Sequence, residues 1–445
     1  MQASKIMIAV AALVCGTAVI AKPNADTIAI SSGASATKGN LKLALTSLCS
    51  AASGTLTEFT SGSNISTYVC ADTAVTAGTY ASKLNTSFKK FAGTNFAELR
   101  LNVTGGSFTA VCALNNWPAS TVCGTINAGS APDKYLDPET GSLVLPATNQ
   151  VVVGGLMDTA PENWGTDVTL GLTLPTAEAT GVAQTFGVAV SPALYAKLFN
   201  AQKNPAVGGG ATVAFPISNS CAEADTGKLE CIPTVSKAQM ASIMVANEFN
   251  AAYSNGVGFL TGDAADNGTV LEYNRRADTS GTQASAQAYF LGTSCASNPL
   301  PVVPSAAVDS NYDLGAIRVF AHSGTGGVRT QLSASGVYGI GVVSGENKGG
   351  TGQTWKWVRI QGAAIGENAV PATVGVTNRD SVKNGSYDFY FESKVVPGSA
   401  SGASAFWGAV TGALSGLSAP TGLLNASDLG TFNKAGFACQ ASVAP

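Results

Sequence analysis

Charged side chains are scarce in this sequence. Only 11% of the 445 residues are Asp, Glu, Lys or Arg, and 24 basic residues stand against 27 acidic ones. No run of Lys and Arg occurs, so the electrostatic footprint of a nucleic-acid-binding protein is missing. We therefore expect no nucleic-acid partner. Small polar residues and glycine take the place of charge on the expected surface.

Histidine is almost absent, since His322 is the only one in the chain. A Ser-His-Asp hydrolase would have to use this residue, and no G-x-S-x-G turn accompanies it. The sequence also lacks a C-x-x-C pair, which excludes the common zinc patterns. We predict a protein that is not an enzyme and has neither a metal site nor a cofactor. His322 is expected to be a structural or surface residue.

Long apolar runs are missing beyond the N-terminus. Lys5 is followed by an apolar stretch over residues 6–20 and then by Ala21, the pattern of a signal peptide with a small-residue cleavage site. This stretch is shorter than the ~20 apolar residues that a membrane-spanning helix needs. We expect residues 1–21 to be a signal peptide. The mature chain would begin at Lys22 and be exported to the periplasm, or be secreted or displayed on the cell surface.

Nine cysteines are present, and Cys15 lies within the expected signal peptide. The other eight form an even number in a chain addressed to an oxidising compartment, which favours disulfides. The sequence leaves their connectivity open. Local spacing favours Cys49 with Cys70, Cys112 with Cys123 and Cys221 with Cys231, leaving Cys295 for Cys439.

The mature chain is longer than the ~250–300 residues at which one hydrophobic core usually stops growing, so two domains are expected. A short apolar strand, a small-residue loop and a helix follow one another three times, starting near Ile28, Leu99 and Val270. This alternation predicts an α/β fold with largely parallel sheets. Gly-, Ser- and Thr-rich stretches lie between these units, and we expect them to be surface insertions held by disulfides. They cover residues 50–80, 124–150 and 204–226.

Hydroxyl side chains gather at the three expected helix starts. Helix N-termini carry unpaired N–H groups and partial positive charge, so three such loops can surround one anion. Taken singly, each hydroxyl also fits an ordinary N-cap. The recurrence favours an anion site. The hydroxyls concerned belong to Thr37, Thr104, Ser107, Ser280 and Thr282.

The segment from Arg275 to Thr282 is the most informative part of the chain. A guanidinium group offers a planar fork that holds two oxygens of a tetrahedral anion. Asp278 lies two residues beyond Arg276 and can hold it in position, after which Ser-Gly-Thr supplies further donors. A surface Arg-Asp pair before a capped helix is the alternative interpretation.

RADTSGT at 276–282 resembles the R-A-D-G-S-G-T signature of periplasmic phosphate-binding proteins, and GASAT at 33–37 resembles the same family's G-A-G-A-T. VTGGS at 103–107 and GGLMD at 154–158 are similar to two further loops of the family, in the same order. The resemblance implies a type II periplasmic-binding-protein architecture with a ligand cleft between two α/β lobes. Lobe one would comprise residues 22–185 and 338–445, and lobe two residues 186–337.

The same resemblance implies a function and a ligand set. An exported solute-binding protein would capture phosphate or a related tetrahedral oxyanion between its lobes and deliver it to an inner-membrane ABC permease. Asp158 would accept a hydrogen bond from protonated phosphate, and Asp278 would orient Arg276. The other ligand contacts would come from Thr37, Thr104 or Ser107, Ser280, Gly281 and Thr282.

Some positions depart from the family pattern. Lys38 replaces an aromatic residue and adds a cation beside the expected pocket, Thr279 replaces a glycine, and Met157 replaces a serine. Phosphate is the leading ligand, while a phosphorylated molecule, another oxyanion or a lost site remain open. The rival hypothesis is a secreted or cell-surface structural or adhesive protein that reuses the binding fold, favoured by the low charge and the disulfide-bonded insertions.

Overall fold

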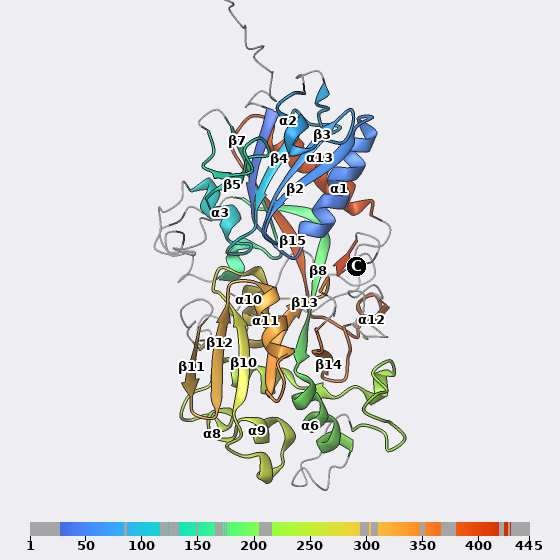
Figure 1. Ribbon diagram of the computed structural model, residues 1–445. Coiled ribbons are helices and arrows are strands. Elements are labelled where there is room, and N and C mark those ends of the chain that lie inside the picture. Colours follow the sequence, from blue (N-terminus) through green and yellow to red (C-terminus); the bar gives the residue numbers. More distant parts are fainter. Residues whose placement is uncertain are drawn as a thin grey trace, which may run out of the picture.

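The computed structural model describes residues 27–83, 87–115, 123, 133–147, 150–164, 172, 174, 176–203, 216–293, 302–303, 310–347, 352–365, 380–417, 422–425 and 428. Most described strands belong to one 14-stranded sheet with the order β11-β12-β10-β13-β8-β15-β7-β1-β4-β3-β2. Figure 1 shows this sheet as two lobes, with β8 (Glu178–Val190) running from one into the other.

Strand β8 changes partners along its length. Up to Thr185 it pairs with β15 (Tyr390–Pro397) and β16 (Leu423–Leu424). From Phe186 onward it pairs with β13 (Gly339–Ser344), and its last residues also pair with β14 (Lys356–Ile360). We call the part of the sheet that includes β15 the first lobe and the part that includes β13 the second lobe.

The first lobe is built around β1 (Ile28–Ser32), which pairs in parallel with β4 (Glu98–Asn102) and β7 (Val151–Met157). Every residue of β1 is buried, as in a parallel strand covered on both faces. Leu41 and Leu45 of α1 pack with Leu99 and Trp407 in the core of this lobe. The helical segments are α1 (Lys38–Ala51), α2 (Ala77–Tyr80), α3 (Thr109–Leu114), η3 (Pro161–Trp164) and α13 (Ala403–Ser415).

The second lobe is built around β10 (Leu271–Arg276), which pairs in parallel with β12 (Ile317–His322) and β13. β11 (Asn311–Leu314) closes the edge in antiparallel pairing, and β9 (Thr234–Val235) pairs with β14. The helical segments are α6 (Pro192–Lys203), η4 (Leu229–Cys231), α7 (Lys237–Met244), α8 (Ala251–Asn255), α9 (Val257–Thr261), η5 (Ala264–Asp266), α10 (Gly281–Ala286), η6 (Gln287–Leu291), α11 (Thr325–Leu332) and α12 (Asp380–Lys383).

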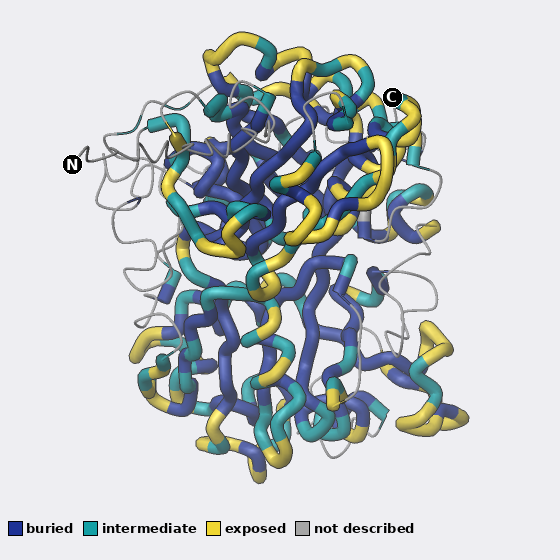
Figure 2. The backbone as a smooth tube through the Cα atoms, turned by 45° about the horizontal axis from the view of Figure 1, so that its top comes forward, coloured by how far each residue is buried: buried dark blue, intermediate teal, exposed yellow. Residues whose placement is uncertain are grey.

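The predicted α/β fold with two lobes is confirmed, and three disulfides are present. The three predicted strand-loop-helix units are β1 with α1, β4 with α3, and β10 with α10. In Figure 2 buried backbone runs through both lobes, while exposed segments lie mainly in loops around them. No helix in the described part of the chain is long and apolar enough to cross a membrane.

The stretch 50–80 is not a simple surface insertion. It contains β2 (Thr55–Ser61) and β3 (Ile65–Ala71) in full, and these strands extend the sheet beyond β4 in antiparallel pairing. β3 is buried along its whole length, because Tyr68 and Cys70 pack in one hydrophobic cluster and Val69 and Ala71 pack in another. Of the stretch 124–150, the described residues include the small hairpin of β5 (Tyr135–Leu136) and β6 (Leu143–Val144).

Three of the four predicted disulfides are confirmed: Cys49–Cys70, Cys112–Cys123 and Cys221–Cys231. Cys295 and Cys439 lie outside the described residues, as does the expected signal peptide. The chain was predicted to return to lobe one at residue 338. Strands β13 and β14 come after this residue, and both of them pair within the second lobe. The predicted lobe bounds otherwise stay a prediction.

Candidate anion-binding site

The strand order of each lobe places the carboxyl ends of its central strands at a switch point. In the first lobe β1 lies between β4 and β7, and in the second lobe β10 lies between β12 and β13. In each lobe the chain therefore leaves two neighbouring strands toward opposite edges of the sheet. Ligands of open α/β sheets bind at such points. The loop after β4 contacts the loop after β10, where the Phe108 N–H donates to the Thr279 carbonyl at 3.1 Å. The two switch points therefore face each other across the lobes.

Ser107 and Asp158 meet at the carboxyl ends of β4 and β7. The Ser107 hydroxyl donates to Oδ2 of Asp158 at 2.9 Å and accepts the Asp158 backbone N–H at 3.3 Å. Both residues are buried. The other carboxylate oxygen, Oδ1, is also buried and has no hydrogen-bond partner among the described residues. A buried acceptor of this kind is costly unless a donor reaches it.

Burial raises the pKa of Asp158 to about 6, whereas the hydrogen bond from Ser107 and the positive charge of Arg276 act in the opposite direction. Arg276 belongs to the second lobe and Asp158 to the first. The site thus combines a buried carboxyl group, whose pKa is raised, with a guanidinium charge from the other lobe.

Gly281 from the second lobe closes over this pair. A methyl group placed on Gly281 would stand 2.3 Å from Oγ of Ser107 and 2.6 Å from Oδ2 of Asp158. Contacts this short do not occur, so only glycine fits while the lobes are in this position. The structure therefore brings together three of the predicted ligand residues: Ser107, Asp158 and Gly281.

Arg276 is held by the loop between β12 and α11. Its guanidinium donates to the carbonyls of His322 at 3.3 Å and Ser323 at 3.0 Å, and to the hydroxyl of Thr325 at 2.6 Å. The expectation that Asp278 orients Arg276 is wrong, because the structure pairs Asp278 with Arg275 instead. Arg275 and Arg276 are consecutive on a strand, so their side chains point to opposite faces and only one can meet this carboxylate.

The remaining predicted residues of the first lobe lie in the surrounding loops. Thr37 is the N-cap of α1, but its side chain makes no capping bond and lies 3.3 Å from the Ala34 carbonyl. Lys38 donates to the Ser63 carbonyl in the β2–β3 turn at 2.7 Å, and burial lowers its pKa. The Thr104 N–H donates to the Asn102 side chain at 2.9 Å. The hydrogen bonds of these three residues go to other groups than Asp158, whose partner among the described residues is Ser107.

Ser280 and Thr282 flank Gly281 and are both buried. Ser280 occupies the N-cap position of α10, yet its side chain makes no capping hydrogen bond. The ordinary N-cap interpretation therefore fails for this hydroxyl, as it does for that of Thr37. Both Ser280 and Thr282 lie beside the residue that contacts Ser107 and Asp158.

Two features of the site were missed from the sequence. The first is the loop at 322–325, which holds Arg276. The second is Glu346, just beyond β13, which accepts hydrogen bonds from Ser344 at 2.7 Å and Gln184 at 3.0 Å. Burial raises the pKa of Glu346 to about 8, and the negative charge of Asp158 adds to this effect. Its place directly after a central strand was the only available signal.

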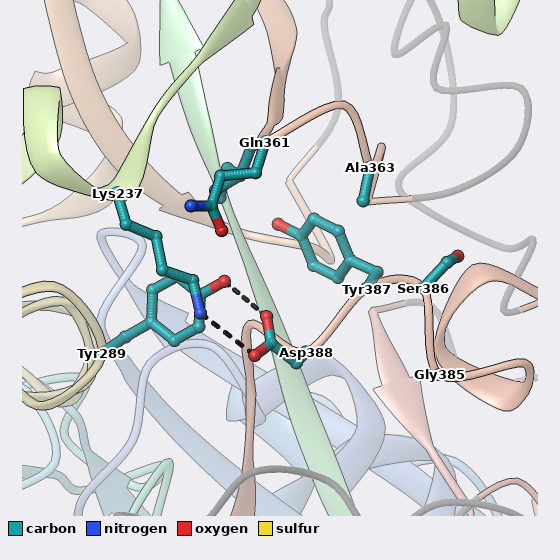
Figure 3. A pocket seen from close by; sticks show the side chains of 9 residues that line it. Lys237, Tyr289, Gln361, Ala363, Gly385, Ser386, Tyr387 and Asp388 are labelled. Atoms are coloured by element: carbon teal, nitrogen blue, oxygen red, sulfur yellow. Dashed lines mark hydrogen bonds and ion pairs between the residues drawn. The ribbon is translucent and has the colours of Figure 1, made fainter. Parts of the chain in front are cut away.

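A separate cavity of about 310 Å³ lies between α7, β14 and the segment before β15. Figure 3 shows Lys237 and Tyr289 both bound to Asp388 there. The Lys237 ammonium lies 4.0 Å from the Tyr289 ring centroid, and Phe389 stacks on the same ring at 4.2 Å. The cation and the carboxylate of this cavity already satisfy each other, and no predicted ligand residue lines it.

Within the described residues, no group of His, Cys, Asp and Glu is arranged to hold a metal ion. His322, the sole histidine, is buried and lies with Nε2 2.9 Å from the Asn274 side-chain oxygen. A structural position for His322 agrees with the expectation.

No family model matches the chain, and no curated protein matches it. Among solved structures, it is similar to a protein from Clostridium perfringens assigned as a phosphate ABC transporter substrate-binding protein, solved with bound phosphate. The TM-score is 0.40 at 9% identity, over 86% of this chain and 92% of that one. It is also similar to a possible phosphate-binding protein from Planctomyces limnophilus, with a TM-score of 0.30 at 9% identity, over 83% and 80% of the two chains.

Proposed function

We propose that this chain is an exported solute-binding protein that captures a protonated tetrahedral oxyanion, with phosphate as the leading ligand, and performs no chemistry on it. The ligand would lie between the two lobes, where Asp158, Arg276 and the Ser280–Thr282 loop come together. An inner-membrane ABC permease would be the partner that receives it. The periplasm is the proposed location.

One observation carries this proposal: Oδ1 of Asp158 is a buried acceptor without a donor among the described residues. A protonated oxyanion brings a hydroxyl donor to such an oxygen, whereas a fully deprotonated oxyanion brings none. Leaving the acceptor unpaired costs about 1–3 kcal/mol, which is enough to discriminate between oxyanions. Arg276 supplies the compensating positive charge from the other lobe.

Capture would follow from closure of the lobes. A ligand that contacts both switch points stabilises the closed arrangement over the open one. Closure also excludes water, so the donors act on the anion at a lower effective dielectric constant. The two lobes touch where Gly281 meets Ser107 and Asp158. Gly281 would therefore have to move away from these two residues to make room for the ligand.

The test is a thermal shift of the mature protein with phosphate, arsenate, sulfate and a phosphate ester, after unfolding and refolding to remove any carried ligand. Phosphate or arsenate should raise the melting temperature, and sulfate should not. Asp158→Asn should abolish this preference, because an amide can donate to sulfate. Asp313→Asn, on the outer edge of the second lobe, is the control. A protein that responds to none of the four would refute the proposal and favour the structural or adhesive alternative.

A further inference from the structure

Among the described residues, two hydrogen bonds join the lobes at the candidate site, and both involve Thr279. Its hydroxyl donates to the Gly105 carbonyl at 2.5 Å, and its own carbonyl accepts the Phe108 N–H at 3.1 Å. Thr279 follows β10 in the second lobe, whereas Gly105 and Phe108 follow β4 in the first. Thr279 is buried in this contact.

We infer that Thr279 is a latch that holds the two lobes together through hydrogen bonds made by the chain itself. This inference goes beyond the proposed function, because it concerns the lobes themselves and stands whether or not the site takes an oxyanion. Opening of the lobes would have to break both hydrogen bonds at once.

The backbone around the latch is shaped for this close approach. Gly106 has φ of +86°, and a methyl group placed on it would stand 2.8 Å from Cα of Ser280. On the other side of the contact, Gly281 leaves no room for a side chain either. Two loops that lie this close exclude water, so their hydrogen bonds are shielded from competition by solvent.

Apolar packing continues the contact next to the latch. Ala284 of α10, in the second lobe, belongs to the same buried cluster as Phe108, Met157 and Trp164 of the first lobe. The latch therefore sits at the edge of a small hydrophobic contact between the lobes. The apolar contact and the two hydrogen bonds both favour the closed arrangement, and the hydrogen bonds fix how the two loops are aligned.

The sequence marks Thr279 as unusual. The R-A-D-G-S-G-T signature that this segment resembles has glycine at the position of Thr279. A glycine offers the backbone carbonyl for the Phe108 N–H but has no hydroxyl for the Gly105 carbonyl. The second bond of the latch therefore depends on the threonine found here.

Hydrogen exchange of the ligand-free mature protein tests the latch, because the Phe108 N–H has its acceptor in the other lobe. We expect protection at Phe108 in the unaltered protein and exchange about two- to tenfold faster in Thr279→Val, which loses one of the two bonds. Thr279→Ser keeps the hydroxyl and should restore protection. Exchange within β4 should not change, which separates opening of the lobes from unfolding.

Thr411→Val is the matched control, since it removes a similar hydroxyl-to-carbonyl bond inside α13, within one lobe. It should leave exchange at Phe108 unchanged. Exchange of Phe108 at an unprotected rate in the unaltered protein would overturn the inference, as would equal exchange in Thr279→Val and Thr279→Ser. Because no ligand is added, failure here is distinct from failure of phosphate to raise the melting temperature.

Discussion

The hydroxyl of Ser107 lies 2.9 Å from Oδ2 of Asp158, although the two residues are 51 positions apart in the chain. Each stands just beyond the carboxyl end of a strand that flanks β1. The parallel arrangement of these strands brings both side chains to one edge of the sheet. Through this contact the first lobe presents a buried carboxyl group to the second.

Ser107→Ala should destabilise the protein most at neutral and higher pH. The hydrogen bond from Ser107 stabilises ionised Asp158, so its loss leaves that charge with less compensation and costs about 1–3 kcal/mol. The loss should be smaller at pH 4, where the carboxyl group of Asp158 is already protonated in the folded state. Urea unfolding at pH 4 and pH 8 measures this difference. The exposed Ser254→Ala is the control, and equal losses at both pH values would contradict the argument.

Asp158→Asn should flatten the pH dependence of stability between about pH 4 and pH 6. The folded-state pKa of about 6 lies above the ordinary 3.8, so the native state binds the proton more tightly than the unfolded state. The contribution of Asp158 to stability is therefore greatest below its pKa in the unfolded state. It is lost as the pH rises through its pKa in the folded state, by on the order of 3 kcal/mol. Glu346→Gln should flatten a window that extends higher, to about pH 8. Guanidinium unfolding across pH 4–9 distinguishes the two windows. An unchanged pH dependence of the unfolding free energy in Asp158→Asn would contradict this account.

Arg276→Ala should lower stability as well as any anion affinity. The side chain is buried and donates to two carbonyls and one hydroxyl in the loop at 322–325. Its removal leaves these acceptors without their donor, and we expect a loss of about 2–4 kcal/mol in the free energy of unfolding. Arg318→Ala, whose guanidinium lies in an exposed pair with Asp313, is the matched control and should cost less than 1 kcal/mol. Equal losses in the two variants would show that the loop does not depend on Arg276.

Loss of the Cys49–Cys70 disulfide should destabilise the protein by about 3 kcal/mol. It closes a loop with a sequence separation of 21 and joins α1 to β3, and in the chain-entropy model longer loops gain more. The Cys221–Cys231 bridge, with a separation of 10, should contribute somewhat less. Unfolding of the two double Cys→Ala variants compares them directly, and a larger loss for the shorter loop would contradict this ranking.

Non-reducing peptide mapping tests the predicted Cys295–Cys439 bridge. We expect a disulfide-linked peptide pair that carries these two cysteines, because the other six are paired. Free thiols at both positions would refute the prediction.

Local pattern was enough to predict the three strand-loop-helix units. Apolar alternation and a Gly- and Ser-rich loop before a helix act within some 20 residues, so no distant contact is needed to recognise them. The three confirmed disulfides are local in the same sense. Local pattern does not determine the burial of every apolar side chain: Leu43 in α1 is 51% exposed, whereas its neighbours Ala44 and Leu45 are buried.

Only the tertiary structure determined which side chains of the site pair with one another. The sequence does not distinguish the two adjacent arginines, but their side chains lie on opposite faces of β10. Asp278 therefore pairs with Arg275, whereas Arg276 has its partners in the loop after β12. The latch at Thr279 depends on two lobes that approach within hydrogen-bonding distance. Residue types and their order predicted what chemistry was available, because these are local properties. Which groups meet depended on strand pairing and lobe closure, since these bring together residues more than a hundred positions apart.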